Sequence, residues 1–133
     1  EIKHPGTQLT VVSSGIMVSK SLAVATKLEA EGISVEVLDL RTLRPMDNEA
    51  IIKSVKKTGR LLVVHEAPQT GGWAGEVLAV VAGSEAFDYL DAPMRRLAGK
   101  DVPIPYNRFL EAAAVPQEAD IEAEIRAILS NKY

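Results

Sequence analysis

Four consecutive apolar residues in the middle of the chain, Leu61 to Val64, constrain the fold more than any other stretch. A strand that is apolar at every position is buried on both faces, as in the interior of a parallel sheet covered by helices. Segments with helical spacing of apolar residues lie before and after this run, and glycine or proline residues separate them. The run therefore predicts an α/β fold.

The rest of the chain alternates between short β-rich runs and longer amphipathic runs. Asp47 is a good N-cap, and Gly59 follows the helix that Asp47 begins. Strands that alternate with helices assemble into a mostly parallel sheet, with right-handed connections and helices on both faces. The predicted strands are 9–12, 34–40, 60–65 and 94–98, and the predicted helices are 17–31, 48–58, one that begins at Thr70 or Gly72, and one that begins near Pro116.

Length, composition and charge limit the possible functions. At 133 residues, the chain is expected to form one domain, residues 1–133. It has no cysteine, which excludes disulfides, thiolate nucleophiles and cysteine metal sites. The net charge is -3 and the basic residues are dispersed, so no nucleic-acid partner is expected. No apolar run approaches the ~20 residues that a membrane span needs, so no membrane partner is expected either.

His65 and Glu66 directly follow the apolar run, at a predicted carboxyl end of a strand, where functional groups gather in such sheets. A histidine beside a carboxylate suggests a general acid–base pair. Adjacent residues of a strand point to opposite faces, however, so the two side chains cannot easily share one proton path. His4, the only other histidine, is expected in an N-terminal tail, which leaves no zinc-protease spacing. We therefore predict no catalytic or metal-binding residue here and interpret His65 and Glu66 as subunit-interface residues.

Two further stretches leave binding functions open. The run from Thr70 to Gly75 has a threonine in the first glycine position of a dinucleotide-binding motif. Glycines that let a helix approach the sheet, with Thr70 as the cap of that helix, explain the run equally well. An independent module for a small ligand or a nucleotide remains an alternative. Arg41 and Arg44 follow a predicted strand, and arginine pairs can clamp carboxylates or phosphates, although a structural role is favoured.

Several runs together resemble one family. Residues 41–47, RTLRPMD, resemble a strand–loop–helix junction in the C-terminal domain of transketolase-like, thiamine-diphosphate-dependent enzymes. Residues 54–72, SVKKTGRLLVVHEAPQTGG, followed by Gly75 and Glu76, more narrowly resemble the β chain of the dehydrogenase component of 2-oxo acid dehydrogenase complexes. The same β chain is matched by the late pattern Ala92-Pro93, Arg96, Gly99, Asp101, Pro103 and Pro105, and by Val115-Pro116-Gln117 with Asp120-Ile121.

The resemblance implies a three-layer α/β/α sandwich whose sheet is mostly parallel, with one antiparallel strand. It also implies that the parent enzyme decarboxylates a 2-oxo acid with thiamine diphosphate and magnesium and transfers the acyl group to a lipoyl group. The family holds that cofactor outside this domain, so we expect no cofactor-binding residue in this chain. Because the chain begins at Glu1 rather than at a methionine, we expect an inactive piece of a longer β chain, without its N-terminal cofactor-binding domain.

The family also implies partners and a location. The partners are the α chain, a second β chain, and the subunit-binding domain of the dihydrolipoyl acyltransferase. Arg44 joins His65 and Glu66 as a candidate at the subunit interface. Asp91 and the carboxylate of Tyr133 are candidates for docking the acyltransferase, because acceptors of this kind meet basic residues. The implied location is the cytoplasm for a bacterial protein and the mitochondrial matrix for a eukaryotic one.

The resemblance is compatible with two classes of substrate. HEAP followed by TGG is similar to the branched-chain enzymes, whereas the residues from Pro103 to Asn107 are similar to pyruvate- or acetoin-type chains. We expect a branched-chain 2-oxo acid. The C-terminal domain of another transketolase-type enzyme, such as a deoxyxylulose-phosphate synthase, is the remaining alternative.

Overall fold

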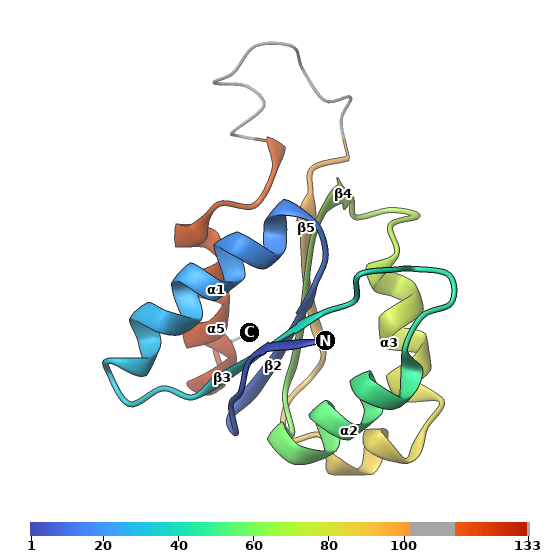
Figure 1. The fold of residues 1–133 in the computed structure, drawn as a ribbon, viewed down its shortest axis with the longest axis horizontal. Helices are drawn as coiled ribbons and strands as arrows, with labels where there is room; N and C mark the ends of the chain where they lie inside the picture. Colours follow the sequence, from blue (N-terminus) through green and yellow to red (C-terminus); the bar gives the residue numbers. More distant parts are fainter. Residues whose placement is uncertain (102–113, 133) are drawn as a thin grey trace.

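A computed structural model describes residues 1–101 and 114–132, in which helices cover both faces of a five-stranded sheet (Figure 1). The strands are β1 (Ile2–His4), β2 (Leu9–Ser13), β3 (Val35–Asp39), β4 (Leu61–Pro68) and β5 (Arg95–Gly99). The helices are α1 (Ile16–Glu29), α2 (Asn48–Thr58), α3 (Ala74–Ala82), the 3-10 helix η1 (Glu85–Tyr89) and α5 (Glu118–Leu129).

The order of the strands is β1-β3-β2-β4-β5. Strands β2, β3, β4 and β5 run parallel, and β1 runs antiparallel to β3, so the predicted fold class is confirmed. The antiparallel strand lies at the N-terminus, where we expected a tail, and the placement of His4 in a tail is therefore wrong. Three residues are too few to show a hydrophobic period, and β1 forms only because Ile2 lies opposite Leu38 and His4 opposite Val37.

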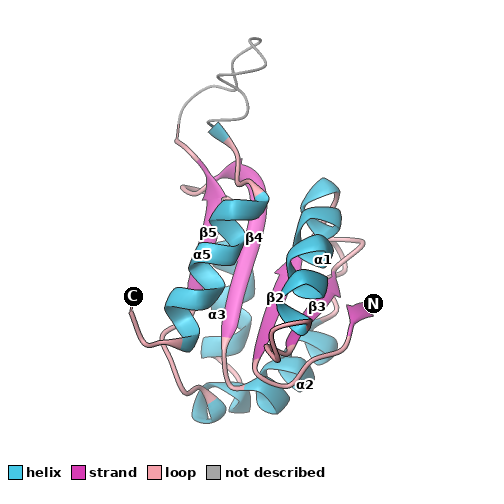
Figure 2. Ribbon diagram, turned by 90° about the vertical axis from the view of Figure 1, so that its left-hand side faces the viewer, coloured by secondary structure: helices cyan, strands magenta, loops and turns pink. Residues whose placement is uncertain are grey.

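The core has two layers, one on each face of the sheet. Leu62 and Val64 of β4 pack on one side with residues of α1 and α5, whereas Leu61 and Val63 pack on the other side with residues of α2 and α3. Figure 1 shows this division, with α1 and α5 to the left of the sheet and α2 and α3 to its right, and in Figure 2 α1 and α5 lie in front of the sheet. The prediction that this strand is buried on both faces is confirmed.

Local sequence signals were sufficient to predict the ends of α2 but not the end of β4. Asp47 caps α2 by accepting a hydrogen bond from the amide of Ala50 at 3.1 Å, and Gly59 ends that helix with a left-handed φ of 74°. Strand β4, in contrast, continues three residues past His65 to Pro68, where it pairs with Gly99 of β5. A register shift between Val64 and Pro68 lets the polar end of the strand stay in the sheet.

A buried polar cluster joins β3 to α2 and to the turn before β2. The Glu36 carboxylate is fully buried and accepts hydrogen bonds from the Ser54 hydroxyl at 2.5 Å and from the Gly6 amide at 3.2 Å. Lys57 pairs with the same carboxylate from the rim of the helix. A buried carboxylate is tolerated only when donors surround it in this way, so the cluster fixes the position of α2 on the sheet.

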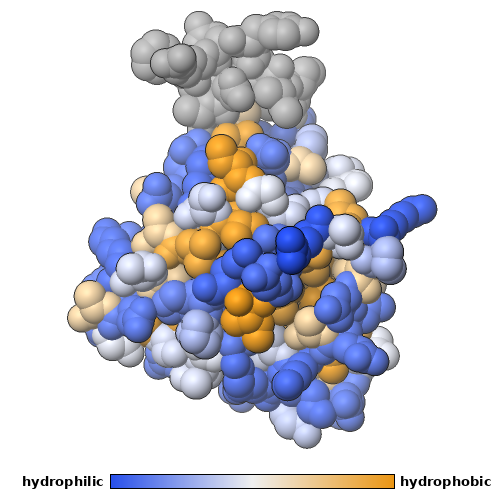
Figure 3. Space-filling model, viewed as in Figure 1, coloured by the Kyte–Doolittle hydropathy of each residue, from blue (hydrophilic) through white to orange (hydrophobic). Residues whose placement is uncertain are grey.

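On the face of the molecule seen in Figure 3, apolar side chains emerge in patches between hydrophilic ones. Ile2 of β1 is one of the large apolar side chains that stay exposed, at 50%. Among the described helices, none is both long enough and apolar enough to cross a membrane.

Candidate interaction site at the ends of strands β3 and β4

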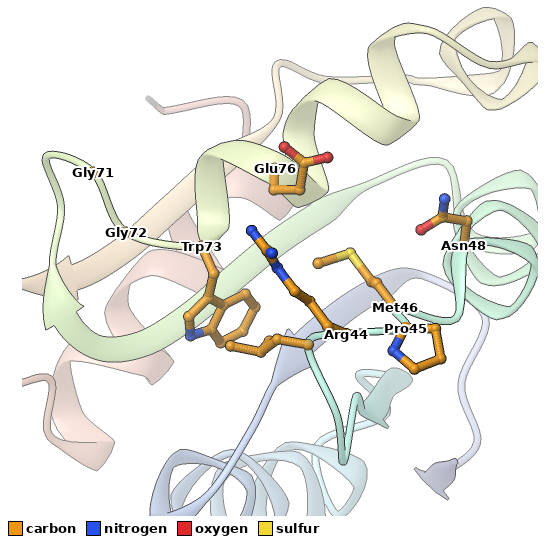
Figure 4. Close-up of a pocket in the computed structure, with 9 residues that line it drawn as sticks. Arg44, Pro45, Met46, Asn48, Gly71, Gly72, Trp73 and Glu76 are labelled. Atoms are coloured by element: carbon orange, nitrogen blue, oxygen red, sulfur yellow. The ribbon is translucent and has the colours of Figure 1, made fainter.

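A pocket with a volume of about 760 Å³ opens beyond the carboxyl ends of β3 and β4. The loop between β3 and α2 forms one wall, and the loop between β4 and α3, with the first turn of α3, forms the other. Figure 4 shows Arg44 extending from the first wall toward α3, with Trp73 to one side and Glu76 ahead of it. The residues that line this Arg44–Trp73 pocket are Leu43, Arg44, Pro45, Met46, Asn48, Gly71, Gly72, Trp73 and Glu76.

The pocket presents exposed side chains, one of which has no hydrogen-bond or ion-pair partner within the described part of the chain. No hydrogen bond or ion pair joins Arg44 to another described residue, and its side chain is exposed. Leu43 is 40% exposed beside it. Arginine and tryptophan are enriched among the hot-spot residues of protein interfaces, and methionine is enriched at interfaces in general. The arrangement therefore suits contact with another polypeptide.

Directly beneath the pocket wall, the His65 ring packs against Gly72 and Trp73. Its centroid lies 5.0 Å from that of the Trp73 ring, at an interplanar angle of 50°. A Cβ atom added to Gly72 would lie 2.6 Å from His65 Nε2 and 2.5 Å from the Pro68 carbonyl oxygen. Only a residue without a side chain fits at this position, so Gly72 lets the loop before α3 lie close to β4, whereas a Cβ at Gly71 or Gly75 would meet no atom within 4 Å.

The structure places His65 inside β4 rather than at the carboxyl end of the strand, where the sequence predicts it. His65 lies inside β4 and is 1% exposed, whereas Glu66, on the opposite face, is exposed. Within the described residues, neither ring nitrogen of His65 has a hydrogen-bond partner. Burial lowers the pKa of His65, and the charge of Arg96 acts in the same direction. Backbone groups near Ala67 offset part of this decrease without reaching hydrogen-bond geometry. Because the pKa stays below its ordinary value, the ring is neutral at pH 7.

Strand β5 and the residues after it hold the β4–α3 loop in place. The Thr70 hydroxyl donates to Asp101 Oδ2 at 2.6 Å, and the Thr70 amide donates to Oδ1 at 3.0 Å. These two donors hold the pKa of Asp101 below its usual value. Arg96 donates to the Gln69 carbonyl at 3.3 Å. Thr70 therefore anchors the loop, and its predicted role as a helix cap is wrong because α3 begins only at Ala74.

The other predicted site residues lie apart from this pocket. Arg41 forms an ion pair with Glu1 at 3.0 Å rather than a clamp with Arg44. Asp91 lies on the surface after η1, where its amide donates to the Gly59 carbonyl at 2.7 Å, and its carboxylate forms no ion pair within the described residues. Tyr133 and the residues from Pro103 to Asn107 are outside the described residues.

Sequence reasoning missed three contributors to the site. The apolar spacing of the helix expected after Gly72 predicts a buried Trp73, but the indole is partly exposed at the pocket, and Met46 and Glu76 entered only as parts of the family resemblance. The sequence carried one usable signal, because the residues from Gly71 to Trp73 follow a strand of a parallel sheet and loops at that edge carry functional groups. Among the described residues, no group of three or more histidine, aspartate or glutamate side chains is placed to hold a metal ion.

Comparisons with known proteins place this geometry in a family. Residues 1–121 match the family model described as "Transketolase, C-terminal domain". The β subunit of the pyruvate dehydrogenase E1 component of Rhizobium meliloti is 47% identical over 96% of this chain and 27% of its own length. The mitochondrial β subunit of the same component of Saccharomyces cerevisiae is 44% identical over 98% of this chain and 36% of its own length.

A solved structure with the description "Split gene transketolase, inactive beta4 tetramer" superimposes on this chain with a TM-score of 0.83. It is 28% identical, and the match covers 100% of this chain and 42% of the other. The chain thus spans about a third of the length of the curated relatives that it matches. Both of those relatives are pyruvate dehydrogenase subunits, so they do not support the expected preference for a branched-chain substrate.

Substituting Gly72→Ala tests the close packing at the pocket wall. The new Cβ would overlap His65 and the Pro68 carbonyl, so we expect a loss of about 1–3 kcal/mol in the free energy of unfolding. Gly75→Ala is the matched control, because a Cβ there meets no atom within 4 Å, and the added helix propensity should stabilise the chain by about 0.5–1 kcal/mol. Urea denaturation followed by fluorescence of the single tryptophan measures both. Equal effects at the two glycines would contradict this packing.

Proposed function

The chain belongs to the transketolase C-terminal domain family, and on that premise we propose that it is the C-terminal assembly domain of a 2-oxo acid dehydrogenase β chain. The observation that carries the proposal is its identity of 44–47% with pyruvate dehydrogenase β subunits over nearly all of its residues. The remaining length of those relatives leaves room for the machinery of the reaction elsewhere in the parent enzyme. Under this proposal, the domain by itself is inactive.

The parent enzyme decarboxylates a 2-oxo acid with thiamine diphosphate and magnesium and transfers the acyl group to a lipoyl group. Pyruvate is the proposed substrate, because the relatives with the highest similarity reported above carry that name. No residue of this chain is assigned to the cofactor. The Arg44–Trp73 pocket does not fit a diphosphate, because the Glu76 carboxylate faces the same space as the guanidinium and would repel phosphate oxygens.

The Arg44–Trp73 pocket is the proposed contact surface for the α chain. An exposed guanidinium without a partner among the described residues, next to a partly exposed indole, has the composition of an interface hot spot. Glu66, exposed at the end of β4, extends this surface. His65 supports the surface from below, through Gly72 and Trp73, rather than touching the partner directly. A second β chain is the further partner that the family implies.

Asp91 is the proposed docking group for the subunit-binding domain of the dihydrolipoyl acyltransferase. Its carboxylate is exposed and is not engaged by a cation within the described residues, so it is available to a basic group of a partner. Tyr133 stays a predicted docking residue. The proposed location of the parent enzyme follows its relatives, which include a bacterial and a mitochondrial protein.

The assignment of the reaction is tested with the complete β chain and its α chain. With thiamine diphosphate and magnesium, the assembled enzyme should release labelled carbon dioxide from pyruvate faster than from a branched-chain 2-oxo acid. The 133-residue chain alone should release none from either. Carbon dioxide release by the chain alone, or a preference of the assembled enzyme for the branched-chain acid, would refute this assignment.

The substitution Arg44→Glu in the complete β chain tests the contact surface. Loss of a hot-spot residue typically costs about 2 kcal/mol or more of binding free energy, so the affinity for the α chain should fall at least about 30-fold. Lys53→Glu is the matched control, since it makes the same charge change at an exposed position of α2 outside the pocket. Sedimentation velocity across a concentration series measures both affinities. If the two variants assemble equally well, the pocket is not the contact surface.

The substitution Asp91→Asn tests the docking group, because it removes the charge and keeps the shape. Titration calorimetry with the acyltransferase's subunit-binding domain should show several-fold weaker binding and a smaller dependence on salt. Asp88→Asn, which removes an exposed charge from the neighbouring η1, should leave the affinity unchanged. If the subunit-binding domain binds the Asp91→Asn variant with unchanged affinity, Asp91 is not part of the docking site.

A further inference from the structure

His4 connects the edge strand β1 to β3 and to α1 through two side-chain contacts. Its Nδ1 atom lies 2.7 Å from the carbonyl oxygen of Val35 in β3, and its Nε2 atom lies 2.8 Å from Oε2 of Glu29, the last residue of α1. The His4 side chain is only 15% exposed, whereas the Glu29 side chain that it meets is 66% exposed. One imidazole ring thus connects β1, β3 and α1.

The chemistry of the two partners determines the protonation state of the ring. A carbonyl oxygen and a carboxylate can only accept hydrogen bonds, so both ring nitrogens must donate. Only the imidazolium form has two N–H groups. We propose that His4 is a protonation-dependent latch, which holds β1 on the edge of the sheet while the ring is charged and weakens that hold when the ring loses its proton.

The charges around His4 favour the imidazolium. Burial opposes the charged ring, but the hydrogen bond to Glu29 and the one to Val35 outweigh it, and together they raise the pKa of His4. The carboxyl end of α1, where Glu29 lies, also carries the negative end of the helix dipole. Both hydrogen-bond partners of His4 therefore favour the imidazolium form.

The other ionic groups near β1 are paired elsewhere. On β1 and before it, Lys3 forms an ion pair with Glu1 at 3.1 Å, and the backbone nitrogen of Glu1 donates to the Asp39 carbonyl at 2.8 Å. On β3, Glu36 belongs to the polar cluster with Ser54 and Lys57 on the α2 side of the sheet. After α1, Glu31 forms an ion pair with Arg126 of α5 at 2.7 Å. Glu29 is thus the carboxylate that governs the latch.

The sign of the pH dependence follows from the raised pKa. The contribution of His4 is fully present below the pKa of the ring in the detached strand, and it is lost as the pH rises through the higher pKa of the docked strand. A neutral ring has one N–H, so either the carbonyl or the carboxylate then faces a lone pair. Detachment of β1 uncovers the backbone edge of β3, which a strand of another polypeptide can pair with.

The chain provides its own internal comparison, because it contains two histidines in opposite environments. An NMR titration of the imidazole carbons should give a pKa above the ordinary value of 6.5 for His4 and below that value for His65. Glu29→Gln keeps an acceptor oxygen and removes the charge, so it should lower the pKa of His4. Glu31→Gln, two residues further on, should leave the pKa of His4 where it is.

Amide hydrogen exchange, corrected for the intrinsic effect of pH, measures the latch itself. The Asp39 amide donates to the Glu1 carbonyl at 2.8 Å and reports the docking of β1, whereas the Thr10 amide donates to the Arg60 carbonyl at 2.9 Å in the interior of the sheet. Raising the pH through the titration of His4 should speed exchange at Asp39 about tenfold for each unit by which docking raises the pKa, and not at Thr10. His4→Gln should abolish this pH dependence.

Two results would overturn the proposal, and neither requires a variant to fold. One is a pKa of His4 in the unmodified chain at or below 6.5. The other is protection of the Asp39 amide that stays constant while His4 titrates.

Discussion

Burial of the central strands on both faces is the constraint on which the rest of the molecule depends. Leu61, Leu62, Val63 and Val64 of β4 alternate between two apolar clusters, and each cluster needs its own layer of helices to exclude water. The three-layer arrangement follows from this requirement. Because every strand of the interior runs the same way, the loops that follow β3 and β4 open at the same edge of the sheet, where they form the Arg44–Trp73 pocket.

Close packing then transmits the rigidity of the sheet to that pocket. His65 continues the buried face of β4, and Gly72 lies so close to it that no side chain fits between them. On the other side, Thr70 is tied to Asp101 after β5. The wall that carries Trp73 is therefore fixed by contacts to two neighbouring strands. A pocket whose wall is already ordered loses less conformational entropy when a partner binds, which suits a surface for assembly.

The two histidines show that residue type does not determine electrostatic character. His65 packs against Trp73 and Gly72 and has no hydrogen-bond partner among the described residues, so burial favours its neutral form. His4 is also partly buried, but it is bracketed by a carbonyl and a carboxylate that favour the charged form. The same side chain thus supports a pocket wall in one place and fastens an edge strand in the other.

The sequence by itself determined the elements whose signals are local. The apolar run of β4, the Asp47 cap and the left-handed Gly59 each act within a few residues, and the fold class followed from the order of such elements. The family resemblance rested instead on particular runs, such as residues 41–47 and 54–72. Only the tertiary structure decided that residues 2–4 form a strand, that β4 continues to Pro68, and that Arg44 meets Trp73 across a pocket. These features depend on partners about thirty residues away along the chain. A short or polar segment carries no periodic pattern of its own, so its conformation is set by whatever surface the rest of the fold presents to it.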